Sequence, residues 1–123
     1  AIAKSVRDAV KMPVAVKLSP FYSNAGNVAK RIADTGVDGL VLFNRFMQPD
    51  IDIEKRTVDA KSYWSQPQDQ RLPLRWIAIL AGRVNANLAA TGGIHEAEDV
   101  IKGLMVGADV TMILRLWTTC AAP

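Results

Sequence analysis

The chain has 123 residues and a formal net charge of +3, with half of its residues hydrophobic and 22% charged, which is typical of one soluble globular domain at most. No apolar run approaches the ~18 residues of a membrane span, and the charged first residues make a poor signal peptide. The small positive excess is scattered, so it does not indicate nucleic acid and fits an anionic small ligand. With Cys120 as the single cysteine no internal disulfide can form, and we expect a reducing, cytoplasmic location without membrane partners.

The first part of the chain alternates helices with short apolar strands. Apolar residues at helical spacing predict a helix over residues 2–10, which Pro13 ends. The segment VAVKL, residues 14–18, predicts a buried strand. An amphipathic helix is predicted over 25–33, and GLVLF, residues 39–43, predicts a second buried strand.

A polar excursion over residues 45–70 then interrupts the alternation. Within it, IDIEKRTV (51–58) and KSYWS (61–65) are expected to pair as a small hairpin. An excursion of this length between core elements is often functional.

The second part of the chain repeats the alternation. Residues 72–84 predict a helix with Pro73 in its first turn, and NLAAT (87–91) predicts a third strand. The amphipathic pattern returns over 97–105, and DVTMI (109–113) predicts the fourth strand.

Strands that alternate with helices in this way indicate a parallel sheet. No strand is followed by the glycine fingerprint of a dinucleotide-binding fold. A (β/α)8 barrel needs ~250 residues, so four strand–helix units are about half of one. We therefore predict an α/β fold: residues 1–123 form a single partial TIM barrel, its C-terminal half, with four parallel strands.

Thr91, Gly92 and Gly93 follow the third strand and precede a helix. Two interpretations stand at equal weight: a sharp turn, or a phosphate held by backbone N–H groups and the helix N-terminus. A glycine pair after a strand is by itself more often a turn, but barrels commonly bind phosphate after strands 7 and 8, and this position raises the second interpretation to that equal weight. On that reading, a carboxylate introduced at Gly93 would enter the phosphate space and repel it.

Two polar side chains fall at the same end of the predicted sheet. Lys17 is a charged residue in an otherwise apolar strand. Three interpretations are open: a lysine whose ammonium extends into solvent at the strand end, a Schiff-base lysine, or a partner for an anionic ligand. Asn44 ends the second strand and either caps a loop or hydrogen-bonds a ring with C=O and N–H edges.

The other chemically interesting residues receive no functional assignment. His95 starts a helix, and Trp64, Trp76 and Trp117 are predicted to pack. Cys120 has no base near it in sequence. No spacing of metal ligands is present, and no metal is expected.

Four segments, VKLSPFYSN, GLVLFNRF, RLPLRWIA and ATGGIHEAEDVIKGLMVGADVTM, together resemble the C-terminal half of dihydroorotate dehydrogenases and their close relatives, over residues 13 to about 113. The resemblance implies an FMN-dependent (β/α)8 barrel that oxidises dihydroorotate to orotate in pyrimidine biosynthesis. It implies that Lys17 contacts the flavin ring, that Asn44 hydrogen-bonds the pyrimidine, and that Thr91, Gly92 and Gly93 hold the FMN phosphate.

The chain departs from the family pattern in several places. Arg45 and Phe46 follow Asn44 where the family has Ser or Thr, SQPQDQ (65–70) replaces a glycine-rich loop, and Leu114-Arg115 follows the last strand. The family's catalytic base, a Cys or Ser of the barrel's first half, is expected outside these residues. No catalytic residue is therefore predicted in this chain.

Three functions follow as alternatives. The first is an FMN-dependent dehydrogenase acting on CH–CH bonds, with a small-molecule substrate and with this chain as its C-terminal fragment. The second is a non-catalytic half-barrel that binds a phosphate-bearing ligand or a partner chain. The third is an aldolase-type barrel that uses Lys17 as a Schiff base. In each case, open barrel edges predict a homo-oligomer or association through those edges.

Overall fold

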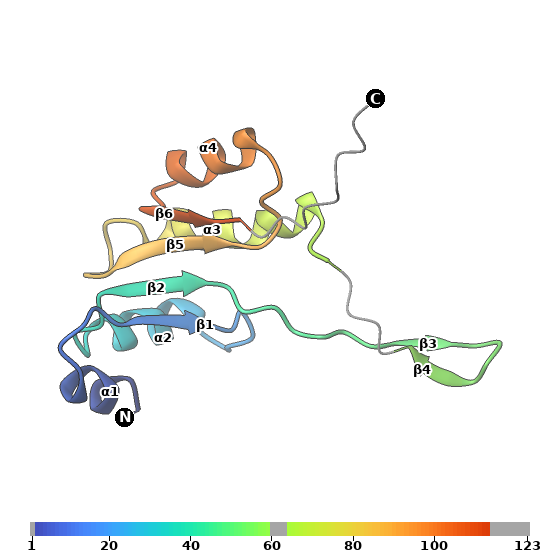
Figure 1. Cartoon of the computed structure of the whole chain (residues 1–123), viewed down its shortest axis with the longest axis horizontal. Helices are drawn as coiled ribbons and strands as arrows, with labels where there is room; N and C mark the ends of the chain where they lie inside the picture. The colour runs from blue at the N-terminus through green and yellow to red at the C-terminus, as the bar shows by residue number, and fades with distance from the viewer. Residues whose placement is uncertain (1, 60–63, 114–123) are drawn as a thin grey trace, which may run out of the picture.

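The structure is a computed structural model that describes residues 2–59 and 64–113. Its helices and strands follow one another along the chain as shown in Figure 1. In order they are α1 (Ile2–Ala9), β1 (Ala15–Leu18), α2 (Ala25–Ala33), β2 (Gly39–Leu42), β3 (Asp50–Asp52), β4 (Thr57–Asp59), a 3-10 turn η1 (Pro67–Gln70), α3 (Arg71–Leu80), β5 (Asn87–Thr91), α4 (Ala97–Met105) and β6 (Val110–Met112).

Four of the strands form one parallel sheet in the order β1-β2-β5-β6. Each neighbouring pair is joined by a crossover, and α2 and α4 make two of these connections. The prediction of four parallel strands alternating with helices, as in half of a (β/α)8 barrel, is confirmed.

One face of the sheet carries the core. Leu18, Leu40, Leu42 and Leu88 alternate along their strands and are buried on this face. They pack against apolar residues of α2 and α3, namely Ala29, Ala33, Ile77 and Leu80. Truncation of such a buried leucine to alanine costs about 2–5 kcal/mol, so this face contributes much of the stability of the sheet.

The opposite face of the sheet is open in this structure. Lys17 pairs in register with Val41, Val41 with Ala89, and Ala89 with Val110, so these residues form one row across the face. Lys17, Val110 and Met112 are exposed there, Val110 to 54% and Met112 to 46%. The four strands of this sheet are thus buried on one face only. In a complete barrel, the inner face of each strand is covered by side chains from the opposite wall.

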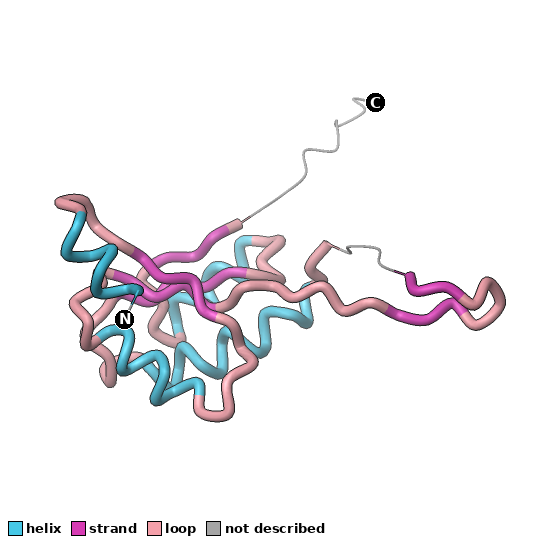
Figure 2. The backbone as a smooth tube through the Cα atoms, turned by 90° about the horizontal axis from the view of Figure 1, so that it is seen from below, coloured by secondary structure: helices cyan, strands magenta, loops and turns pink. Residues whose placement is uncertain are grey.

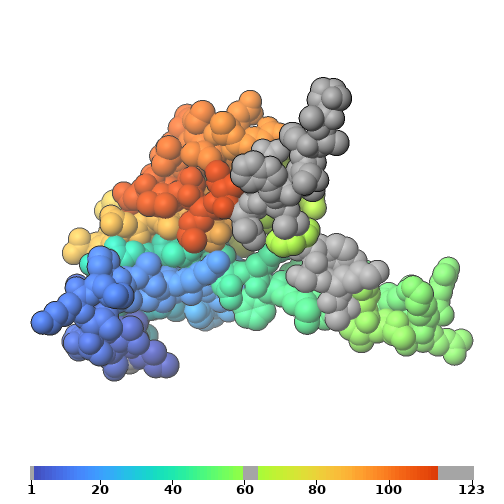
Figure 3. Space-filling model, in the orientation of Figure 1, coloured from blue at the N-terminus to red at the C-terminus, as the bar shows by residue number. Residues whose placement is uncertain are grey.

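The excursion forms a hairpin in a different place from the predicted one. β3 and β4 pair antiparallel within residues 50–59, with Ile51 opposite Val58, so the prediction of 51–58 as one side of the hairpin is wrong. Residues 61–63 of the predicted partner segment, 61–65, lie outside the described residues. The side chain of Asp52 explains the turn, since it accepts a hydrogen bond from Lys55 N–H (2.9 Å) and an ion pair from its ammonium (3.0 Å). The hairpin extends away from the body of the protein in Figures 1 and 3 and in the perpendicular view of Figure 2.

Among residues 2–59 and 64–113, no helix combines the length and the apolar character that a membrane crossing requires.

Candidate functional site

The carboxyl ends of β1, β2 and β5 meet at one edge of the sheet, because the strands are parallel and adjacent. A cavity of about 520 Å³ opens at this edge. All five residues that the sequence singled out line it: Lys17, Asn44, Thr91, Gly92 and Gly93. The structure therefore brings together groups that lie as far as 76 positions apart in the chain.

Lys17 stands on the open face of β1, one residue before the end of the strand. Its side chain is exposed, and within the described residues its ammonium makes no hydrogen bond or ion pair. A cation without a protein partner at the rim of a cavity is available to a negatively charged ligand.

Asn44 is held at the rim by its backbone. Its N–H donates to the carbonyl oxygen of Leu18 at 2.6 Å, which ties the segment after β2 to the end of β1. Phe43 is buried beneath it, whereas the Asn44 side chain is exposed to the cavity region. The amide can both donate and accept a hydrogen bond there.

The loop after β5 presents backbone N–H groups. Gly92 and Gly93 have φ values of +91° and +70°, a conformation that glycine adopts without steric cost. The N–H groups of His95 and Glu96 donate to the Asp99 carboxylate at 3.1 and 3.2 Å. In the described part of the chain, no hydrogen bond leaves the N–H of Gly92, Gly93 or Ile94. Successive unpaired N–H groups of this kind form a concavity suited to an anion.

The two glycines differ in what surrounds them. A Cβ on Gly92 would have no atom within 4 Å, whereas a Cβ on Gly93 would collide with the backbone N of Gln70 and lie 2.9 Å from the Gln66 carbonyl oxygen. The expectation that a side chain at Gly93 would enter the phosphate space is therefore wrong. Gly93 allows the loop to pack on the turn that precedes α3, and Gly92 is the position that faces free space.

We expect Gly93→Ala to destabilise the fold by roughly 2 kcal/mol or more, because the added methyl group meets fixed backbone and the φ angle is positive. Gly36→Ala is the matched control: its φ is +85° and a Cβ there meets nothing within 4 Å, so it suffers the φ penalty alone. Urea unfolding of both variants measures the difference. Equal losses would show that the contact between Gly93 and Gln70 is unimportant.

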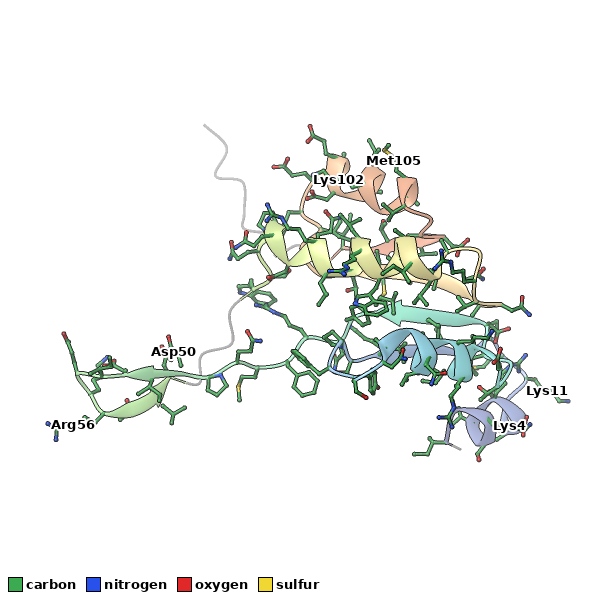
Figure 4. All side chains as sticks on the ribbon, turned by 180° about the vertical axis from the view of Figure 1, so that it is seen from behind. Lys4, Lys11, Asp50, Arg56, Lys102 and Met105 are labelled. Carbon is green, nitrogen blue, oxygen red and sulfur yellow. The ribbon has the colours of Figure 1, made fainter. Side chains whose placement is uncertain are left out.

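A charged pair on α4 joins Asp99 of its first turn to Lys102 of its last turn (Figure 4 labels Lys102). Lys102 Nζ lies 2.9 Å from Asp99 Oδ1. This hydrogen bond, followed by that from the His95 N–H, lowers the pKa of Asp99 below its ordinary value, and the same carboxylate raises the pKa of Lys102. Asp99 is consequently ionised at neutral pH and remains an acceptor for the loop N–H groups.

A second cavity of about 600 Å³ adjoins the first and shares Asn44, Thr91 and Gly92 with it. The rings of Phe21 and Phe46 meet edge to face there, with centroids 5.3 Å apart. This aromatic compartment extends the site on the side of α3.

Several lining residues carry no signal in the sequence. Phe43, Arg45, Ile94 and Met112 border the first cavity, and their types alone do not mark them as functional. Trp64 also lines it and is 58% exposed, so its prediction as a packing residue is wrong. Only the position of these residues in the fold identifies them as part of the cavity lining.

Some of the sequence-based predictions fall on residues that the structure does not describe. Trp117, Cys120 and the divergent segment from Leu114 onward lie outside the described residues. Within 2–59 and 64–113, no three His, Cys, Asp or Glu side chains gather as a metal site would require. The Nε2 atom of His95 is buried without a hydrogen-bond partner in the same part of the chain.

Fold and site together define a class of protein: a parallel α/β barrel segment with a cavity at the carboxyl ends of its strands and a glycine-containing loop after β5 that lines this cavity. Residues 1–119 match the family model of dihydroorotate dehydrogenase, and the chain belongs to this family.

Curated relatives agree with the family match. The chain is 30% identical over 115 residues to the catalytic subunit of dihydroorotate dehydrogenase B (NAD(+)) from Bacillus thuringiensis, and equally to those from Bacillus mycoides and Bacillus cereus. Each alignment covers 91% of this chain and 37% of the relative. The chain thus spans little more than a third of the length of the curated relatives it matches.

Proposed function

We propose that the natural protein carrying these residues is an FMN-dependent oxidoreductase of the dihydroorotate dehydrogenase type, and that residues 1–123 supply the C-terminal part of its barrel. Its substrate is dihydroorotate or a related dihydropyrimidine, and its place is in pyrimidine biosynthesis. One observation supports the proposal above all: at one cavity of a family member, an ammonium, an amide side chain and three backbone N–H groups lie together without partners among residues 2–59 and 64–113.

The residues present fit FMN at its two ends. The N–H groups of Gly92, Gly93 and Ile94, which make no hydrogen bond within the described part of the chain, suit the phosphate, and the free space beside Gly92 leaves room for it. Lys17 lines the same cavity, where its positive charge would stabilise negative charge on the flavin ring. When bound, FMN would supply the hydride acceptor, and these side chains would bind and orient it.

Asn44 would orient the substrate, since its amide matches the alternating C=O and N–H edges of a dihydropyrimidine ring. Its exposed side chain on the rim of both cavities supports this role. Arg45 stands next to it and forms a long ion pair with Asp69 at 3.9 Å. The base that removes the substrate proton would come from a Cys or Ser outside these residues, so the proposal concerns the activity of the natural protein.

Anaerobic addition of dihydroorotate to the flavin-loaded natural protein tests this function. We expect the flavin absorbance near 450 nm to bleach as the ring accepts a hydride, about one flavin reduced per substrate oxidised. A flavin that is bound but is not reduced by dihydroorotate or dihydrouracil would contradict the proposed substrate class. A protein that does not retain a flavin at all would contradict the proposed cofactor.

We expect Lys17→Ala to slow flavin reduction by roughly tenfold to a hundredfold, because one charge opposite a developing negative charge is lost. Lys30→Ala, which removes an exposed lysine on α2 away from the cavity, is the matched control. Stopped-flow absorbance under anaerobic conditions gives both rates. If Lys17→Ala is reduced as fast as Lys30→Ala, Lys17 takes no part in the reaction.

A further inference from the structure

Three contacts anchor the loop of residues 91–96, and together they close a ring. The Cα of Gly93 packs against the backbone of Gln70. The Gln70 side chain donates from Nε2 to the backbone carbonyl of Asp99 at 2.6 Å. The Asp99 carboxylate in turn accepts from the N–H groups of His95 and Glu96, which continue from Gly93.

Gln70 and Asp99 are the two buried polar residues in the described part of the chain, with residue exposures of 2% and 7%. Buried polar groups require hydrogen-bond partners, and each such pairing fixes geometry strongly because the alternative is an unsatisfied group. The Asp99 side chain bonds the loop directly, and the Gln70 side chain bonds the backbone of Asp99. The proposed function described above does not use either of them.

The Asp99 carboxylate also determines which N–H groups remain for a ligand. Since it accepts from His95 and Glu96, an anion in the cavity is left with the N–H groups of Gly92, Gly93 and Ile94. The charge of Asp99 is paired with Lys102 at 2.9 Å. Its acceptor oxygen, rather than its charge, is therefore the property that acts on the loop.

We propose that Gln70 and Asp99 are positioning residues that hold the Gly92, Gly93 and Ile94 N–H groups in the orientation that selects a phosphate monoester. On this account they set the preference of the protein for FMN over riboflavin, which has the same ring and no phosphate. The inference rests on the proposed function, in which this loop binds the flavin phosphate.

Titration of the flavin-free natural protein with FMN and with riboflavin, followed by flavin fluorescence, tests the inference. In Asp99→Ala we expect the ratio of the two affinities to fall about tenfold through weaker FMN binding, with riboflavin binding unchanged. Asp99→Asn keeps an acceptor oxygen for the loop and is expected to keep the ratio within about twofold of the wild type. Glu98→Ala removes a carboxylate of the same turn that makes no hydrogen bond to the loop among the described residues, and should leave the ratio unchanged.

Gln70→Met provides a second test that stands if Asp99→Ala does not fold, because it removes the Nε2 donor at similar length. We expect the same fall in the FMN-to-riboflavin ratio. A wild-type ratio in either folded variant, or an equal weakening of both flavins, would overturn the positioning role. Failure of the proposed function has a different signature, since the wild-type protein itself would then show no preference for FMN.

Discussion

Replacement of Gly92 by aspartate is expected to abolish retention of FMN by the natural protein. A Cβ at this position enters open space at the cavity, so the new carboxylate would lie beside the phosphate without disturbing the packing. Two unit charges about 4 Å apart near a protein surface repel by roughly 4 kcal/mol, which corresponds to a loss of about a thousandfold in affinity. The flavin content after gel filtration measures the effect.

Gly92→Asn is the matched control for this substitution. Asparagine has the shape of aspartate and tolerates the positive φ of +91° about as well, so the two variants differ essentially in charge. We expect Gly92→Asn to keep most of its FMN. Full flavin occupancy in Gly92→Asp, or equal losses in both variants, would remove electrostatic repulsion of a phosphate as the explanation.

Residues 1–123 expressed alone are expected to self-associate and to bind FMN weakly or not at all. β1 and β6 each leave one edge without a strand partner in the described sheet, and such edges are templates for association. Val110, Met112 and Lys17 stand on the open face beside them. Two copies that pair β6 of one with β1 of the other would form an eight-stranded ring, which is the ordered outcome.

Sedimentation velocity at micromolar concentration, with and without FMN, measures this association. Dimers or larger species with substoichiometric flavin are the expected result. A stable monomer that unfolds cooperatively and binds one FMN would contradict the interpretation of this sheet as part of a barrel.

Much of the fold is predictable from the sequence because it depends on local periodicity. The apolar spacing over 25–33 and 97–105 matches α2 and α4 as observed, and NLAAT matches β5. The hairpin was misplaced because its turn, residues 53–56, contains no glycine, although Arg56 adopts a φ of +52°. Propensity alone does not reveal a turn that depends on the Asp52 side chain.

The candidate site, like the fold, is predictable from the sequence only where the signal is local. Lys17, Asn44 and the Thr91-Gly92-Gly93 loop are marked by polar or glycine residues at strand ends, and they do share one cavity. The packing of Gly93 on Gln70 could not be predicted, because it joins residues 23 positions apart that belong to different elements. Asp99 had a local signal, the acidic residue three positions after Glu96 at the start of a helix, which is the spacing of a capping box.

The most direct test of the central claim is a crystal structure of the natural protein reconstituted with FMN. We expect the phosphate oxygens to lie within hydrogen-bond distance of the N–H groups of Gly92, Gly93 and Ile94, and Lys17 Nζ to lie against the flavin ring. A phosphate held elsewhere, with these N–H groups facing water, would contradict it.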